Sequence, residues 1–199
     1  MGVYLYQSGT ETGLKNAYIG RGIYEVDFTT WTHWWTASSS AGKQDSGGLY
    51  TNGNLTEVSW LAPSEIYTPW TPKKVIINYN KTGTDSWIWI RTPAWNGSWY
   101  SLPRWPVSSS QNNRFDRSNN WTITQNTISN PTWEVTWELD IDTSTTNWTI
   151  THKITGVSNI TESSWVFKNI WDSLEFNLKI VNRNNSNQWL HIKNIRFEY

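Results

Sequence analysis

Apolar and polar residues alternate with a period of two along several segments of this chain. In residues 133–142 every odd position is apolar and every even position is polar. Successive side chains of a β-strand point to opposite faces of a sheet, so this pattern predicts a strand with one buried and one wet face. The alternation resumes after a polar segment at 143–146, which indicates an antiparallel hairpin.

Other segments of the chain show the same two-residue period. No segment shows a convincing helical period. The apolar residues move from even to odd positions between Ile192 and Ile195, which predicts a β-bulge near Asn194. In residues 92–120, Pro93, Pro103 and Pro106 lack the backbone N–H that central pairing needs, so we expect this stretch to be irregular. Further strands are expected at 24–28, 73–80, 86–91, 121–123, 174–180 and 190–199, with breaks at 38–48, 52–54, 108–113, 143–146 and 182–187.

Strands that follow one another without intervening helices indicate an all-β fold. We expect an antiparallel two-sheet β-sandwich of jelly-roll type. A length of 199 residues fits one large domain of this kind, and no linker or internal repeat divides the sequence. The predicted organisation is therefore a single β-sandwich domain, residues 1–199.

Composition excludes several function classes. Sixteen basic and sixteen acidic residues cancel, which argues against a nucleic-acid partner, and no apolar run predicts membrane insertion. There is no cysteine, and His33, His152 and His191 show no metal-ligand spacing, so we expect no cofactor and no metal. No secretory signal is visible at residues 1–6, and we expect a virion or extracellular surface location.

Seventeen tryptophans are an excess for this length, and the strand pattern divides them. Trp121, Trp133, Trp137 and Trp148 fall on apolar strand positions and are predicted to lie in the core. Trp87 and Trp89 share one face of a strand whose other face carries Ile88 and Ile90, so either both faces are buried or one aromatic pair points outward.

The remaining aromatic residues crowd strand ends and the proline-rich stretch, beside arginines. Flat indoles stack on the apolar faces of sugars, while guanidinium and amide groups bind hydroxyls. The alternative is that these residues seal the ends of the sandwich or form a subunit interface, where tryptophan and arginine are also enriched. The candidate ligand-binding residues are Trp31, Trp34, Trp35, Trp95, Trp99, Tyr100, Trp105, Arg91 and Arg104.

One row of carboxylates is a candidate catalytic set. Glu138, Asp140 and Asp142 share one face of the strand at 133–142. The segment resembles the E-[ILV]-D-x-x-E signature of family 16 glycoside hydrolases, which are retaining β-jelly rolls. That resemblance implies Glu138 as nucleophile, Asp140 as assisting acid and Asp142 as acid/base, where the family has glutamate. The alternative is the plain solvated face of an amphipathic strand.

Both ends of the chain resemble a second family. Residues 3–11, V-Y-L-Y-Q-S-G-T-E, are similar to the opening of lectin-like β-sandwich domains in phage tail and virion-associated proteins. Residues 189–199, W-L-H-I-K-N-I-R-F-E-Y, are similar to the closing strand of those domains and of jelly-roll carbohydrate-binding modules. The resemblance implies a β-sandwich and an association with virions.

These observations leave three functions. The first is a non-enzymatic subunit of a virion or surface assembly with a glycan-binding or adhesive role. The second is a purely structural capsid, decoration, tail or filament subunit with tryptophan-rich interfaces, and the third is a family-16-like glycoside hydrolase. The expected partners are a glycan or neighbouring subunits, and exposed surplus aromatics would favour a homo-oligomer.

Overall fold

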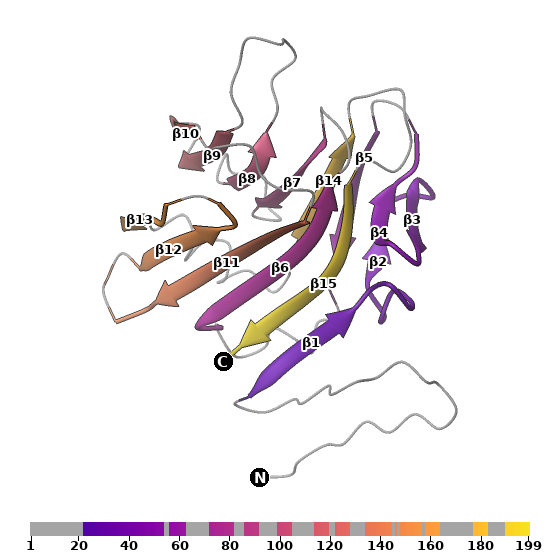
Figure 1. Cartoon of the computed structure of the whole chain (residues 1–199), viewed down its shortest axis with the longest axis horizontal. Coiled ribbons are helices and arrows are strands. Elements are labelled where there is room, and N and C mark those ends of the chain that lie inside the picture. Colours follow the sequence, from indigo (N-terminus) through magenta and orange to yellow (C-terminus); the bar gives the residue numbers. More distant parts are fainter. Residues whose placement is uncertain are drawn as a thin grey trace.

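The structure is a computed structural model, in which every regular element of the described residues is a β-strand. The described residues are 22–53, 56–62, 72–81, 86–91, 99–104, 114–119, 122–127, 134–144, 146, 148–156, 158–163, 177–182 and 190–199. Figure 1 shows the strands arranged as two layers, and one of them holds β11, β6, β15 and β1 side by side.

Sheet A is antiparallel and has eight strands, in the order β13-β12-β11-β6-β15-β4-β3, with β1 also paired to β15. Its long central strands follow the alternating segments of the sequence. The strands are β1 (Ile23–Asp27), β3 (Gly42–Asp45), β4 (Gly48–Thr51), β6 (Lys74–Lys81), β11 (Glu134–Asp142), β12 (Thr149–Ile154), β13 (Ile160–Ser163) and β15 (Leu190–Glu198).

Sheet B is also antiparallel and has seven strands, in the order β10-β9-β8-β7-β14-β5-β2. The C-terminal strand β15 belongs to sheet A, whereas β14, the strand that precedes it in sequence, belongs to sheet B. The strands of sheet B are β2 (Thr36–Ala37), β5 (Thr56–Leu61), β7 (Ser86–Arg91), β8 (Trp99–Arg104), β9 (Arg114–Asn119), β10 (Thr122–Thr127) and β14 (Asn177–Asn182).

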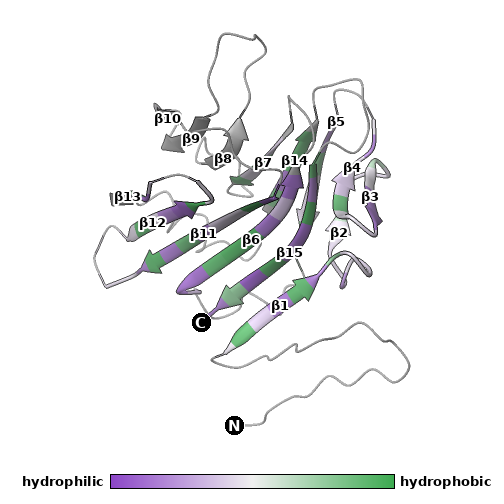
Figure 2. Cartoon of the chain, viewed as in Figure 1, coloured by the Kyte–Doolittle hydropathy of each residue, from purple (hydrophilic) through white to green (hydrophobic). Residues whose placement is uncertain are grey.

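The core lies between the inner faces of the two sheets. Alternate residues of each central strand are buried there. Figure 2 shows the same alternation along the strands as green hydrophobic bands and purple hydrophilic bands. In β11 the buried residues are Val135, Trp137, Leu139 and Ile141, and the intervening polar residues face outward. The predicted all-β, two-sheet antiparallel sandwich of jelly-roll type is confirmed.

Two local predictions are also confirmed. The strand at 133–142 and the segment after 143–146 form the antiparallel β11–β12 hairpin, in which Asp142 pairs with Thr149. The register of β15 against β6 shifts between Ile192 and Asn194, which is the expected bulge. Gly48 lies against this bulge with a φ of 120°, and a Cβ there would stand 2.1 Å from the Ile192 carbonyl oxygen, so a larger residue does not fit.

Two predicted irregular regions contain strands, and the expectation is wrong there. β3 lies inside the break expected at 38–48, and β8 and β9 lie inside the irregular stretch expected at 92–120. The register of β8 against β9 shifts between Ser101 and Arg104, and Pro103 falls within that shift. A proline can sit in a strand where ladder pairing is already interrupted, which is why Pro103 did not prevent β8 from forming.

The core prediction for tryptophan holds where the structure describes it. Trp137 is fully buried and donates its indole N–H to Nδ1 of His152 over 3.3 Å, and Trp148 packs half-buried against the core. Trp121 and Trp133 lie outside the described residues. Within the described part of the chain, no helix is long and apolar enough to span a membrane.

Candidate functional site

The chain crosses from sheet A to sheet B through residues 28–35, which we call the tryptophan turn. It follows β1 and leads into β2, an edge strand of sheet B. Within it, Trp34 is 69% exposed, and among the described residues the other large apolar side chain classed as exposed is Ile23, at 37%. Trp34 therefore presents an indole to solvent.

The backbone of the tryptophan turn is strained at two consecutive positions. His33 has a φ of 49° and Trp34 a φ of 67°, whereas non-glycine residues usually keep φ negative. A left-handed residue with a Cβ costs roughly 1–2 kcal/mol. Such strain persists when the surrounding structure over-determines it and is concentrated at functional sites, so the exposure of Trp34 is imposed by the fold.

Aromatic contacts support the exposed ring from below. The Trp34 and Trp31 rings meet edge to face, with centroids 5.3 Å apart and planes at 81°. Trp31 in turn lies against His33, with ring centroids 4.7 Å apart, and His33 lies 6.2 Å from the ring of buried Phe28. The exposed indole of Trp34, which we call the platform, is thus connected to the core through the rings of Trp31 and His33.

Hydrogen bonds fix the ends of the turn to three strands. The Asp27 carbonyl of β1 accepts from Nε2 of His33 at 2.8 Å and from the Thr30 hydroxyl at 3.0 Å. Gln44 of β3 donates its amide to the Phe28 carbonyl at 3.0 Å, and the Phe28 N–H donates to the Lys193 carbonyl of β15 at 2.7 Å. The turn is therefore held from several sides.

Trp35 is a correction to the predicted ligand-binding set. It is 2% exposed and packs edge to face on Phe28 with centroids 5.3 Å apart, as part of the core. The left-handed pair at 33–34 reverses the chain direction, so neighbouring indoles in the sequence point to opposite environments. A surface ligand cannot stack on Trp35.

The other predicted aromatic and basic residues fall in or near sheet B. Arg91 in β7 and Trp99 in β8 are direct register partners. Tyr100 pairs with Ile90, and Arg104 pairs with Arg114 of β9. Trp95 and Trp105 lie outside the described residues.

The sequence left open whether both faces of the strand at 86–91 are buried or one aromatic pair points outward. Ile88 and Ile90 belong to the core, so Trp87 and Trp89 lie on the outer face of sheet B, with ring centroids 6.1 Å apart. Trp87 is nevertheless only 5% exposed, so the outer face is also covered at this point.

That outer face also holds a half-buried ion pair that the sequence did not reveal. Lys179 of β14 is 8% exposed, forms an ion pair with Glu57 of β5, and places its Nζ 5.0 Å from the centroid of the Trp89 ring. In the sequence, Lys179 is one polar position of an alternating strand like many others. Its register between Ser59 and Trp89 is a product of the sheet order.

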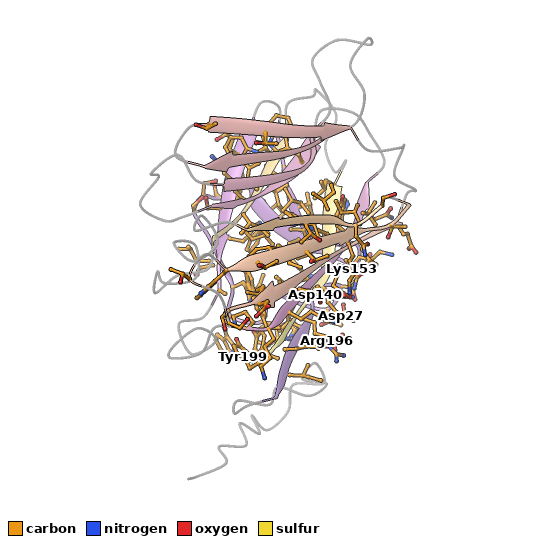
Figure 3. All side chains as sticks on the ribbon, turned by 90° about the vertical axis from the view of Figure 1, so that its left-hand side faces the viewer. Asp27, Asp140, Lys153, Arg196 and Tyr199 are labelled. Atoms are coloured by element: carbon orange, nitrogen blue, oxygen red, sulfur yellow. The ribbon has the colours of Figure 1, made fainter. Side chains whose placement is uncertain are left out.

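The carboxylate row lies on the outer face of sheet A, as the alternation of β11 predicts. Figure 3 labels Asp140 and Lys153, which lie together on one side of the molecule. The Nζ of Lys153 is 2.8 Å from Glu138 Oε1 and 2.5 Å from Asp140 Oδ2. Lys74 also contacts both acids, at 3.2 Å from Glu138 and 3.5 Å from Asp140.

The pKa values of Asp140 and Asp142 are both lowered. Burial raises the pKa of Asp140, but the hydrogen bond from Lys153 and the charges of Lys153 and Lys74 outweigh burial and lower it overall. Hydrogen bonds from Ser144 lower the pKa of Asp142, whose Oδ1 accepts the Ser144 N–H at 2.9 Å in the hairpin turn. A general acid needs the opposite shift, a raised pKa.

Metal binding gains no support from the geometry. Among the described residues, no group of three or more histidine, aspartate or glutamate side chains is arranged to hold a metal ion. Each of Glu138 and Asp140 instead directs oxygens at lysine ammonium groups, which compete with a cation for the same lone pairs.

No protein-family model and no curated protein sequence matches this chain. Its fold is similar to solved structures of Crh5 transglycosylase. The apo form gives a TM-score of 0.59 at 12% identity, covering 90% of this chain and 85% of that one. The complex with NAG gives 0.58 at 13% identity, covering 89% and 83%.

A third similar structure comes from a phage. The CBM2 module of the evolved Dit of Lactobacillus casei BL23 phage J-1 gives a TM-score of 0.57 at 7% identity, covering 89% of this chain and 97% of that one. What these proteins share with the chain is the fold. It is an all-β sandwich that occurs in a transglycosylase and in a phage carbohydrate-binding module.

Proposed function

We propose that this protein is a non-enzymatic β-sandwich subunit of a virion or surface assembly that binds glycans through the tryptophan turn. The observation that carries the proposal is the 69% exposed indole of Trp34, fixed by two left-handed residues and supported by Trp31. Exposing a large apolar ring at the cost of backbone strain is unfavourable unless the ring has a ligand. A preformed flat indole stacks on a sugar with little further ordering.

The similar structures support this choice of ligand class and assembly. One is a transglycosylase solved with NAG, and another is a carbohydrate-binding module of a phage Dit. The resemblance of both chain ends to virion-associated lectin-like domains points the same way. N-acetylglucosamine and its oligomers are therefore the first probes, followed by a glycan array.

The carboxylate row supports a non-enzymatic role. Glu138 and Asp140 share the same two lysines, and Asp142 caps the hairpin turn. Asp142, the acid/base that the resemblance implies, has a lowered pKa, whereas retaining hydrolysis requires a raised pKa of its acid/base. The amphipathic-strand interpretation accounts for the row.

The test compares two substitutions of exposed apolar residues. Trp34→Ala removes the platform, and Ile23→Ala is the matched control, since both side chains are exposed. Loss of one stacking indole should weaken glycan binding by about tenfold or more, while the control binds like the wild type. Thermal unfolding checks that both variants keep the fold. Equal binding by Trp34→Ala and wild type would exclude this site.

A structural subunit is the second candidate, and the same exposed indole favours it. In that case Trp34 packs against a neighbouring copy, and Trp34→Ala lowers the oligomeric state measured by light scattering with no glycan bound by either protein. Glycan binding by the wild type as a monomer would exclude this alternative.

A further inference from the structure

His33 is a buried titratable group inside the tryptophan turn that glycan stacking does not itself use. Its side chain is 3% exposed and lies between the rings of Trp31 and Phe28. It is also one of the two left-handed residues of the turn, next to Trp34. A change in the charge or position of the His33 ring therefore acts on the backbone of the turn and on the Trp31 ring, which together hold Trp34 in place.

The hydrogen bonds of His33 define its tautomer. Nε2 lies 2.8 Å from the Asp27 carbonyl oxygen, and a carbonyl can only accept, so Nε2 carries the proton. Nδ1 of the neutral ring is then an acceptor, buried and without a hydrogen-bond partner in the described structure. Protonation would add an N–H donor at Nδ1 with no acceptor to receive it, a cost comparable to burying an unsatisfied polar group.

The surroundings offer little to stabilise an imidazolium. Burial lowers the pKa of His33, and the hydrogen bond to the Asp27 carbonyl and the charge of the Asp27 carboxylate oppose this only in part. That carboxylate is already engaged by the N–H and hydroxyl of Thr29, at 2.9 and 2.6 Å. The other groups that contact the imidazole are neutral, namely the rings of Trp31 and Phe28 and the Thr30 hydroxyl, which lies 3.5 Å from Nε2.

We infer that protonation of His33 releases the tryptophan turn and withdraws the Trp34 platform, so that the site binds its glycan at neutral pH and loses it in acid. This inference rests on the proposed function, since it concerns the regulation of the same site. The coupling is mechanical: a charged ring must leave its place between Trp31 and Phe28, and Trp34 rests on Trp31.

The first measurement needs no ligand. With uniformly ¹⁵N-labelled protein, the indole N–H signal of Trp34 is assigned by its loss in Trp34→Phe and followed from pH 7.5 to pH 4. We expect it to shift together with the imidazole signal of His33, assigned by His33→Gln. In His33→Gln the Trp34 signal should stay constant, because a neutral amide does not titrate. A Trp34 signal that ignores the titration of His33 in the wild type would overturn the inference.

The second measurement is glycan affinity over the same pH range, with circular dichroism checking the fold at each pH. We expect wild-type affinity to fall by about tenfold or more, since one pKa unit of differential protonation corresponds to a tenfold change. His33→Gln should bind equally at both ends of the range. His191→Gln is the matched control, because burial also lowers the pKa of His191 but this residue lies in β15, outside the turn.

The two proposals fail in distinguishable ways. Tight glycan binding that is independent of pH, or equally pH-dependent in His33→Gln, overturns the His33 switch and leaves the glycan site intact. Absence of glycan binding at every pH overturns the proposed function, and the Trp34 signal still decides whether His33 controls the turn.

Discussion

The Nζ of Lys153 lies 2.5 Å from Oδ2 of Asp140, two residues after Glu138 on the same outer face of sheet A. Lys153 also reaches Glu138, and Lys74 contacts both acids, so two ammonium groups are shared by the two carboxylates that resemble a hydrolase nucleophile and its assistant. These contacts pair Glu138 and Asp140 with lysines on the outer surface of sheet A.

Glu138→Gln should leave function unchanged. Since the row is a paired strand face, we expect no hydrolysis of β-glucans or galactans by the wild type, and the same glycan affinity in wild type and variant. Release of reducing sugar is the measurement. Hydrolysis by the wild type that disappears in Glu138→Gln would establish the enzyme instead.

Asp140 should contribute to stability in a pH-dependent manner. Its pKa is lowered in the folded protein, so its contribution is present above the pKa of the unfolded chain and is lost as the pH falls through the folded value. Asp140→Asn should therefore lower the melting temperature at pH 7 and have less effect at pH 3. An effect of equal size at both pH values would contradict this account.

Substitution of Trp34 and of Trp35 by alanine should lower the free energy of unfolding by very different amounts. Trp35 is in the core, so Trp35→Ala should lower the free energy of unfolding by about 3–5 kcal/mol, whereas exposed Trp34 should cost under about 1 kcal/mol. Urea denaturation gives both values. If Trp35→Ala does not fold, Trp35→Phe should fold with a smaller loss. Equal effects for the two alanine variants would contradict the described turn.

The half-buried pair of Lys179 and Glu57 should be energetically coupled. Lys179→Met should destabilise the fold, because it leaves Glu57 without its cation and removes the ammonium group that lies over the Trp89 ring. In a double-mutant cycle with Glu57→Gln, we expect a coupling energy of about 1–3 kcal/mol. Additive effects of the two substitutions would show that the pair contributes no specific interaction.

The local alternation of apolar and polar residues was sufficient to predict much of the fold. The alternation in β11, the hairpin to β12 and the bulge between Ile192 and Asn194 all depend on which face a side chain takes along one strand, and the sequence records that directly. It was insufficient for β3 and β8, since a two-residue period is weak in short strands and proline is tolerated where pairing is interrupted.

The sequence by itself determined the class of the fold, the wet and buried faces of its long strands and the candidate status of Trp34. Only the tertiary structure decided that Trp35 is core while Trp34 is exposed, that Arg91 pairs in register with Trp99, and that Lys74 and Lys153 contact Glu138 and Asp140. The physical reason is the separation along the sequence of the residues that determine each feature. Strand periodicity is a property of neighbouring residues, whereas strained turns, cross-strand register and ion pairs depend on which distant segments the sheets bring together.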